Sequence, residues 1–258
     1  MRLAERIVRG TLRRAGYNVT KAEPEFPAEP EFPSDFDPTT RDVCRLVRPF
    51  TMSSPERIFA LRQSVLYVIQ HGIQGDIVEC GVWKGGSMMV VARTLQESGI
   101  TDRNLYLFDT FEGMPAPTQD DVDFRGESAA DLLSKSPKES SDNIWAYAVL
   151  DEVKRNLLST GYPAERMFFV KGKVEETIPG HAPARIALLR LDTDWYESTY
   201  HELVHLYPRL SLGGVLIIDD YGHWAGARKA VDTYFAEHNL QLLLNRIDYT
   251  GRICVKVS

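Results

Sequence analysis

The chain has 258 residues, of which 43% are hydrophobic and 26% are charged, an ordinary composition for a globular protein. This length suits one α/β domain with short extensions. The 30 Lys and Arg and 36 Asp and Glu give a formal net charge of −6. That charge argues against general nucleic-acid binding, because such binding needs a basic surface. No apolar run approaches the roughly 20 residues that span a bilayer, so we expect no membrane span.

The three cysteines indicate a reducing compartment. Cys44, Cys80 and Cys254 are widely spaced and odd in number, so they predict neither a disulfide framework nor a zinc site. The N-terminus also lacks the apolar core and small-residue cleavage site of a secretory signal. We therefore expect a cytoplasmic protein.

The first 38 residues differ in composition from the rest of the chain. Residues 1–16 carry five arginines and one glutamate, with apolar residues at helical spacing, which predicts a basic amphipathic helix. Residues 21–38 contain Glu-Pro-Glu-Phe-Pro twice, and the prolines exclude a helix or a central strand. The helix can touch an acidic membrane surface, but we expect it to pack on the body or on a second subunit. We interpret 1–38 as an arm for packing or oligomer formation and 39–258 as one domain of a homo-oligomer.

From about Thr40 the sequence alternates between helix and strand patterns. Ser54-Pro55-Glu56 predicts a helix start, and apolar residues then recur every three or four positions as far as Gly72. Short apolar runs typical of buried parallel strands lie at 76–80, 105–109, 167–170, 186–192 and 214–219. Helix-length segments separate them, for example 198–210 and 224–238. This alternation predicts a doubly wound α/β sandwich, closed by an antiparallel hairpin of 241–247 and 253–257.

A glycine-rich turn follows the first predicted strand. Gly81, Gly85 and Gly86 let a ligand approach the backbone, and the next helix start, with the hydroxyl of Ser87, favours an anion. The spacing is not Gly-x-Gly-x-x-Gly, which disfavours a nicotinamide site. Asp109 ends the next predicted strand, where an acid can accept both hydroxyls of a ribose. The two strand ends together predict a cofactor that contains a nucleoside and an anionic group.

Carboxylates gather after the fourth and fifth predicted strands, at Asp192, Asp194, Asp219 and Asp220. Because neighbouring parallel strands end at the same edge, these groups repel one another unless they are paired. A divalent cation relieves the repulsion, and a set of oxygen ligands favours Mg²⁺, or Mn²⁺ or Ca²⁺, over Zn²⁺. The alternative is a solvated acidic rim paired with Arg190 or Arg228.

A cation in such a site can bind an acceptor hydroxyl and lower its pKa, while a nearby base removes the proton. We assign metal binding to Asp192, Asp219 and Asp220. Asp194 is the first candidate for the catalytic base, because it lies two residues beyond Asp192. His223 is the second, since its unperturbed pKa is near neutrality, although a contact at a helix start explains it equally well.

Four longer motifs make the chain similar to a known family. Segments 51–57, 76–89, 107–115 and 219–222 together resemble the macrocin O-methyltransferase family, over about 35–258. The resemblance implies a Rossmann-like S-adenosylmethionine methyltransferase sandwich, with a mostly parallel seven-stranded sheet and an antiparallel C-terminal hairpin strand. It also implies Mg²⁺-dependent O-methylation of a sugar hydroxyl on a glycosylated natural product, such as a macrolide or aminocoumarin antibiotic.

The resemblance further implies which residues bind S-adenosylmethionine. It assigns 51–53 to a lid over the cofactor, the glycine turn to the methionine carboxylate, and 171–175 to the neighbourhood of the adenine. The residues predicted to bind the cofactor are Thr51, Met52, Ser53, Glu79, Gly81, Gly85, Gly86, Ser87, Asp109, Thr110, Phe111, Gly172, Val174, Glu175 and Asp192. The metal and base roles fall on the aspartates assigned above.

Two other functions stay open beside sugar O-methylation. One is a related enzyme that acts on a non-sugar hydroxyl or performs hydroxylation, and the other is a non-catalytic cofactor-binding assembly partner. The acidic set disfavours the second, because binding alone does not need it. We expect the acid-rich and Pro-rich insertion at 111–141 to shape the acceptor pocket together with Trp195, Tyr196, Tyr221 and Trp224.

Overall fold

The structure is a computed structural model that describes residues 32–136 and 145–257. The described residues from Phe36 onward belong to one compact unit. The predicted helix at 1–16 and most of the predicted linker at 21–38 lie outside the described residues. No helix of the described residues is both long and apolar enough to cross a membrane.

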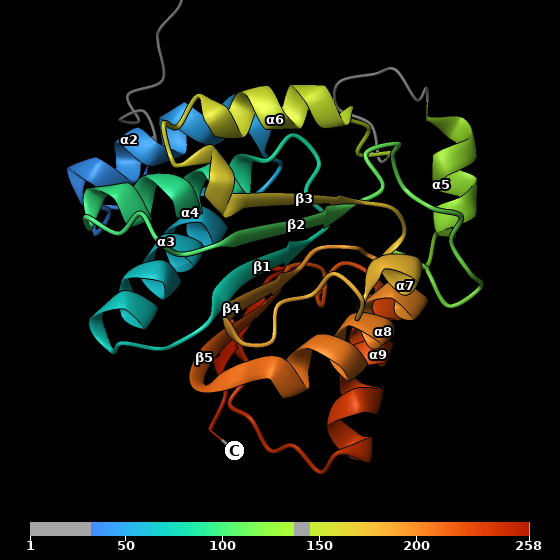
Figure 1. Ribbon diagram of the computed structural model, residues 1–258. Helices are drawn as coiled ribbons and strands as arrows, with labels where there is room; N and C mark the ends of the chain where they lie inside the picture. The colour runs from blue at the N-terminus through green and yellow to red at the C-terminus, as the bar shows by residue number, and fades with distance from the viewer. Residues whose placement is uncertain (1–31, 137–144, 258) are drawn as a thin grey trace, which may run out of the picture. The chain divides into compact units, whose positions relative to one another are not determined.

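A seven-stranded sheet forms the centre of this unit, in the strand order β3-β2-β1-β4-β5-β7-β6 (Figure 1). The first five strands are parallel, whereas β7 pairs antiparallel with both β5 and β6. The strands are β1 (Asp76–Cys80), β2 (Leu105–Asp109), β3 (Met167–Lys171), β4 (Ile186–Leu191), β5 (Leu210–Ile218), β6 (Asn245–Arg246) and β7 (Arg252–Val255). The predicted sheet with its C-terminal hairpin is therefore confirmed, although β5 is longer and β6 shorter than the apolar pattern indicates.

Helices cover both faces of the sheet, as a doubly wound fold requires (Figure 1). One face carries α2 to α4 and α6, which contact one another, and the other carries α7 to α9. The helices are α2 (Pro38–Val47), α3 (Pro55–Gln70), α4 (Gly86–Glu97), α5 (Ala129–Lys135), α6 (Leu150–Leu158), α7 (Val174–Thr177), α8 (Tyr196–Leu206) and α9 (Ala225–Glu237). Short 3₁₀ turns lie at Arg48–Phe50, Ala164–Arg166 and Tyr207–Arg209.

The local sequence explains where the elements that frame the site begin. The Ser54 hydroxyl accepts a hydrogen bond from the backbone N–H of Arg57 at 3.2 Å, which caps α3 as the Ser-Pro-Glu pattern predicts. Gly85 caps α4 with a φ of 88°, a conformation that favours glycine. A Cβ at this position would collide with Leu157 of α6, so close helix packing also requires glycine here.

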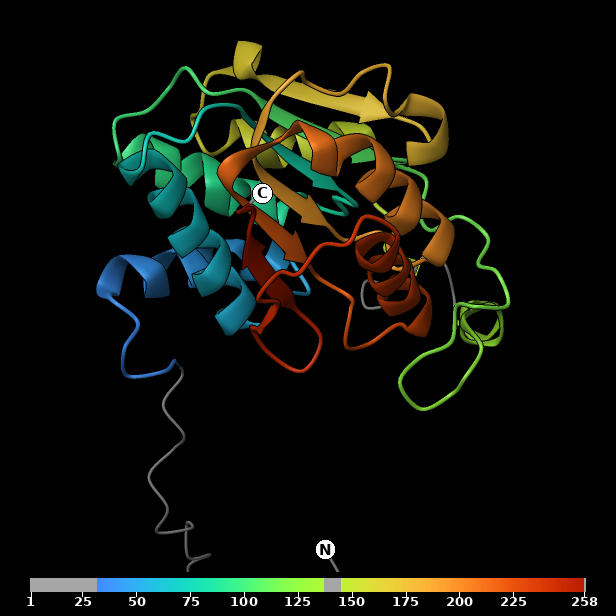
Figure 2. The ribbon, with the colours of Figure 1, turned by 90° about the horizontal axis from the view of Figure 1, so that it is seen from below.

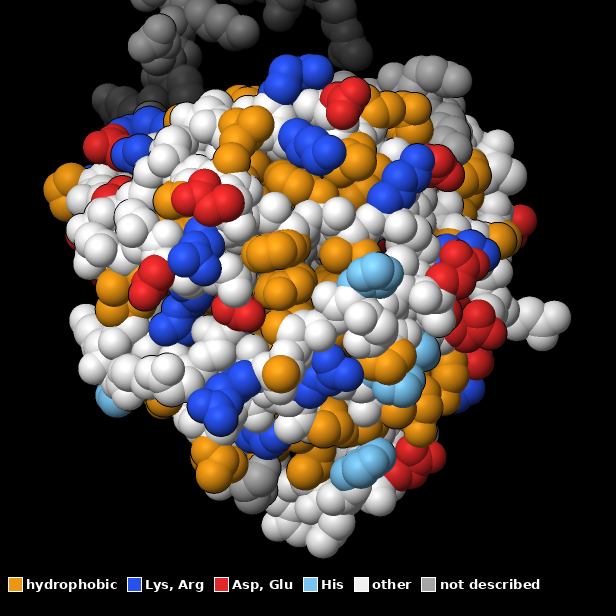
Figure 3. All heavy atoms as spheres, viewed as in Figure 1, with side chains coloured by type: hydrophobic (Ala, Val, Ile, Leu, Met, Phe, Trp, Pro, Cys, Tyr) orange, Lys and Arg blue, Asp and Glu red, His pale blue; other side chains and the backbone are white. Residues whose placement is uncertain are grey.

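Described residues of the predicted insertion at 111–141 contact α9 and the residue just before it. The insertion contains α5, and an isolated β-bridge joins Asp123 to Trp224 just before α9. The Lys229 ammonium of α9 also lies 2.9 Å from the Asp120 carboxylate. In both ribbon views the insertion, drawn in green, lies beside α9 (Figures 1 and 2). On the face shown in Figure 3, basic and acidic side chains are interspersed among hydrophobic ones.

The continuously apolar strands form the core, because helices pack on both of their faces. Leu189 in β4 is fully buried and lies in the cluster between the sheet and the helices α8 and α9. We expect Leu189→Ala to lower the free energy of unfolding by about 2–5 kcal/mol, through lost burial and the cavity that it leaves. Urea denaturation measures this loss. Leu243→Ala, at a side chain that is 79% exposed, is the control and changes stability by less than about 0.5 kcal/mol. Equal effects of the two substitutions would contradict this assignment of the core.

Candidate active site

A cavity of ≈ 300 Å³ opens at the carboxyl ends of the parallel strands, the edge where doubly wound sheets bind ligands. Segments from β1, β2, β4 and β5 line it, together with the chain before α3 and the loop after β3. Twelve of the fifteen residues predicted to bind the cofactor line this cavity. They are Thr51, Met52, Ser53, Gly81, Gly86, Ser87, Asp109, Thr110, Gly172, Val174, Glu175 and Asp192. Glu79, Gly85 and Phe111 are outside its lining.

The glycine turn lets three chain segments approach closely at the floor of the cavity. Gly81 has a φ of 79°, and a Cβ there would collide with the backbone carbonyl of Asp192 at the end of β4. Gly86 begins α4, and a Cβ there would collide with the backbone of Phe50 and with Thr51. The backbone N–H groups of the first turn of α4 have no partner within the helix, so this turn favours an anionic ligand group.

Asp109 fixes the conformation of the glycine turn. Its carboxylate accepts hydrogen bonds from the backbone N–H groups of Val82 at 2.7 Å, Trp83 at 3.1 Å and Phe111 at 2.6 Å. Burial raises the pKa of Asp109, although these hydrogen bonds oppose the increase. Each carboxylate oxygen can accept more than one hydrogen bond, so Asp109 can hold the turn and also face a ligand in the cavity.

A buried guanidinium links the ends of three neighbouring strands. Nη1 of Arg190 in β4 lies 2.7 Å from Glu79 of β1 and 2.7 Å from Asp192, and its Nη2 lies 2.7 Å from Asp219 after β5. Nη2 also donates to the Ser53 hydroxyl at 3.2 Å. Burial opposes the charge on Arg190, but the surrounding carboxylates hold its pKa well above the usual value. Arg190 therefore pairs with two of the four aspartates, Asp192 and Asp219.

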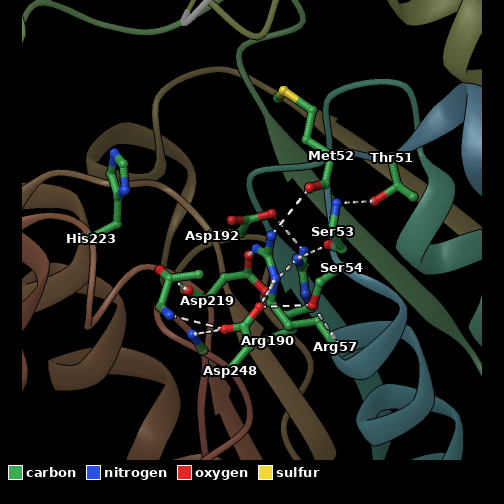
Figure 4. A network of polar contacts seen from close by, with 12 residues as sticks. Thr51, Met52, Ser53, Ser54, Arg57, Arg190, Asp192, Asp219, His223 and Asp248 are labelled. Atoms are coloured by element: carbon green, nitrogen blue, oxygen red, sulfur yellow. Dashed lines mark hydrogen bonds and ion pairs between the residues drawn. The ribbon is translucent and has the colours of Figure 1, made fainter. Parts of the chain in front are cut away.

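Arg57 is a second cation at the acidic set, and sequence reasoning gave it no role. It forms ion pairs with Asp219 and, at 3.1 Å, with Asp248, while its Nη2 donates to the Met52 carbonyl at 3.1 Å. Both carboxylate oxygens of Asp219 are thus bonded to guanidinium groups, one from Arg57 and one from Arg190. Figure 4 shows this network joining the chain before α3 to the ends of β4 and β5. The only sequence signal for Arg57 was its position in the motif at 51–57.

The remaining carboxylates form a compact group. Asp192, Asp194 and Asp220 each present one oxygen within 4.8 Å of the others. Asp194 has a φ of 66°, unusual for a residue other than glycine, so the chain turns sharply after β4 and aims this side chain at Asp220. Burial and the neighbouring Asp192 raise the pKa of Asp194 to about 7. Burial and the charges of adjacent aspartates also raise the pKa of Asp220 well above its usual range.

His223 lies apart from the guanidinium network (Figure 4). It lines the cavity, and its Nδ1 shares a hydrogen bond of 3.1 Å with the Tyr249 hydroxyl. Burial lowers its pKa. Of the four aromatic residues predicted to shape the acceptor pocket, Trp224 lines the cavity, whereas Trp195, Tyr196 and Tyr221 do not.

The sheet order, the glycine turn and the cavity above it define a Rossmann-like methyltransferase. Residues 17–256 match the macrocin O-methyltransferase (TylF) family, and the chain belongs to this family. It is accordingly an S-adenosylmethionine-dependent O-methyltransferase. All three predicted features are confirmed: the family, the fold and the enzyme class.

Two characterised relatives and one solved structure illustrate the match. The chain is 35% identical, over 78% of its length and 73% of the relative, to a tetracenomycin-C 4'-O-methyltransferase of Streptomyces olivaceus that acts on the 8-demethyl-8-(2,3-dimethoxy-alpha-L-rhamnosyl) compound. It is 32% identical, over 88% of its length and 86% of the relative, to demethyldecarbamoylnovobiocin O-methyltransferase of Streptomyces niveus. The solved structure of the O-methyltransferase NovP has a TM-score of 0.71 at 32% identity, covering 81% of this chain and 83% of that one.

The guanidinium of Arg190 neutralises carboxylates that are out of contact with bulk water. We expect Arg190→Met to lower the free energy of unfolding by about 3–5 kcal/mol, because it leaves Glu79 and Asp219 buried with less positive charge. Arg228→Met is the control, since Arg228 is exposed, its Nε donates to the Tyr221 carbonyl, and its guanidinium lies 5.6 Å from the Tyr221 ring centroid. Thermal and urea denaturation of both variants measure the difference. A loss below about 1 kcal/mol for Arg190→Met would contradict a central role for this ion-pair network.

Proposed function

We propose that this enzyme transfers the methyl group of S-adenosylmethionine to a sugar hydroxyl of a glycosylated natural product, in a reaction that depends on a divalent cation. The observation that carries the proposal is the group of three carboxylates, Asp192, Asp194 and Asp220, at the edge of the cofactor cavity. The two relatives, which methylate a rhamnosyl tetracenomycin and demethyldecarbamoylnovobiocin, support the same acceptor class. Hydroxylation and a non-catalytic role as a cofactor-binding assembly partner have no comparable support.

The cofactor half of the cavity is suited to a molecule with an anionic end and a ribose. S-adenosylmethionine supplies an electrophilic methyl group when bound. The start of α4 and the hydroxyl of Ser87 offer donors to its carboxylate, and Asp109 offers acceptors to ribose hydroxyls. Thr51–Ser53 and Gly172–Glu175 line the cavity on other sides.

The acidic group fits a hard divalent cation. Oδ2 of Asp220 is buried and has no hydrogen-bond partner among the described residues, which is costly unless a ligand compensates for it. Three carboxylates with oxygens within 4.8 Å of one another are the kind of donor set that Mg²⁺ takes. A cation held there supplies Lewis acidity that lowers the pKa of an acceptor hydroxyl.

The four aspartates take three roles in this proposal. Asp192 and Asp220 hold the cation. Asp219 was also predicted as a ligand, but its two oxygens are bonded to Arg57 and Arg190, so we propose that it acts mainly by fixing the arginines beside the site. Asp194 adjoins the ligands and faces Asp220, and we propose that it removes the proton of the acceptor hydroxyl. Self-association and a cytoplasmic location stay predictions from the sequence.

The cation requirement is tested by methyl transfer with and without a chelator. Demethyldecarbamoylnovobiocin and the rhamnosyl tetracenomycin are the acceptor probes. We expect EDTA to lower turnover at least a hundredfold and added Mg²⁺ to restore it, because an unaided sugar hydroxyl is a weak nucleophile at neutral pH. Binding of S-adenosylmethionine, measured by calorimetry, is the control and stays within about threefold. Full activity in EDTA would contradict the metal role.

The assignment of Asp194 as base is tested by separating turnover from cation binding. We expect Asp194→Asn to reduce kcat by about a hundredfold or more while the Kd for Mg²⁺ changes little. Asp220→Asn should instead weaken Mg²⁺ binding directly. Asp232→Asn is the control, because this exposed carboxylate only accepts a hydrogen bond from Tyr221. If Asp194→Asn weakens Mg²⁺ binding as much as Asp220→Asn does, Asp194 is a ligand rather than the base. Near-normal turnover of Asp194→Asn would assign the base role to His223.

A further inference from the structure

The turn after β4 aims Asp194 at the acidic group in a strained conformation. The backbone N–H of Trp195 donates to the Thr193 carbonyl at 2.7 Å, which closes a three-residue turn centred on Asp194. Asp194 has a φ of 66°, so this is a γ-turn of the positive-φ kind, which is rare and strained. Strained backbone persists only where its surroundings hold it in place. The contacts of Thr193 and Trp195 must therefore hold this turn.

Trp195 anchors the turn on its C-terminal side. The residue is buried, and its indole Nε1 donates to the Pro115 carbonyl at 3.1 Å. Its ring packs edge-on against Trp224, with ring centroids 5.0 Å apart. The Trp195 carbonyl also accepts the backbone N–H of Thr199 at 3.0 Å, in the first turn of α8. The residue after Asp194 is therefore fixed by packing and by the helix that follows.

Glu202 of α8 anchors the turn on its N-terminal side. The Thr193 hydroxyl donates a hydrogen bond to Oε2 of Glu202 at 3.2 Å. Glu202 is fully buried, and it belongs neither to the lining of the cavity nor to the group of three carboxylates. Its helix packs against α9 and the sheet, which gives the carboxyl a fixed position. Glu202 therefore has no direct access to a ligand and reaches the site through Thr193.

A buried acid such as Glu202 is costly where no cation neutralises it. The polar groups that act most strongly on it are the Thr193 hydroxyl, the Cys80 thiol and two further acids, Glu175 and Asp192. Burial raises the pKa of Glu202 well above its usual range, which favours the uncharged carboxyl. Its Oε1 is buried and has no hydrogen-bond partner among the described residues. An apolar side chain would serve packing better, so the hydrogen bond from Thr193 explains the carboxyl.

The two residues proposed to hold the cation have anchors of their own. The Asp192 backbone N–H donates to the Cys80 carbonyl at 2.9 Å, and its carboxylate lies 2.7 Å from Nη1 of Arg190. Asp220 belongs to a different segment, which follows β5. Loss of the Glu202 contact therefore releases the turn at Asp194 and leaves the cation ligands in place.

We propose that Glu202 is a positioning residue: it holds Thr193 and thereby aims the Asp194 carboxylate at the acceptor hydroxyl. This inference rests on the proposed function, since it concerns the residue assigned there as the base. An uncharged carboxyl needs only its acceptor oxygen for this role, so an amide can replace it and an apolar side chain cannot. A displacement of about 1 Å at a reacting group can lower a rate about a hundredfold, so the anchor has a measurable effect on turnover.

The positioning role is tested by steady-state kinetics with demethyldecarbamoylnovobiocin as the acceptor. We expect Glu202→Met and Thr193→Val each to lower kcat about tenfold or more, while KM for both substrates and the Kd for Mg²⁺ stay within about threefold. Glu202→Gln, which keeps the acceptor oxygen, should retain kcat within about threefold of the wild type. The double variant Thr193→Val/Glu202→Met should lose no more than either single variant, because both changes break the same contact.

The control is Leu206→Ala, which removes a fully buried side chain from the core one turn further along α8. It should lower stability in urea denaturation and leave the kcat of the folded protein within about twofold of the wild type. This comparison separates a loss of stability from a loss of positioning. If Glu202→Met does not fold, Thr193→Val compared with Glu202→Gln carries the same test.

Three outcomes would overturn the positioning role: an unchanged kcat for Glu202→Met, an equal loss for Glu202→Gln, or losses that multiply in the double variant. Lost turnover in Asp194→Asn together with normal turnover in Glu202→Met would overturn this inference and leave the proposed function standing. Near-normal turnover in Asp194→Asn would instead overturn the base role on which the inference rests.

Discussion

The arrangement of this active site depends on one buried guanidinium. Arg190 is 4% exposed and bonds Glu79, Asp192 and Asp219, which end three adjacent strands of the sheet. A cation in that position permits carboxylates to gather out of contact with bulk water, where unpaired anions are costly. Burial still raises the pKa of Glu79 to about 7 despite this partner, which shows how strongly the environment opposes charge. The single positive charge of Arg190 is therefore shared among the three carboxylates that it bonds.

The way in which this positive charge is shared explains why the four aspartates fall into two groups. Asp219 is fully engaged by Arg190 and Arg57, so the two arginines fix it in place. Asp194 and Asp220 are left without a guanidinium partner among the described ion pairs, and together with Asp192 they form a compact oxygen set beside the cavity. The same arginines join the chain before α3 to Asp192 and Asp219 at the strand ends, so the wall of the cavity and these two aspartates form one connected network (Figure 4).

The fold and most of the cofactor cavity were predictable because they depend on local patterns. Strands buried on both faces are apolar throughout, and the glycines of the turn are required wherever backbones approach closely, as Gly81 does to Asp192. The role of Arg57 was not predictable, since its partners Asp219 and Asp248 lie far along the chain. The position of Phe124 was not predictable for a related reason. One aromatic residue in a polar insertion does not indicate which side chains it will contact.

The sequence by itself determined the sheet, the order of helices and strands along the chain, the glycine turn that lines the cavity and the presence of four aspartates at two strand ends. These follow from residue type and spacing within short segments, where the backbone allows few conformations. Only the tertiary structure decided which aspartates are neutralised by arginine and which are left to face the cavity. It also decided which aromatic side chains lie at the entrance of the cavity. Both depend on contacts between residues distant in the chain, and such contacts arise only when the strands are paired and the insertion is folded against α9.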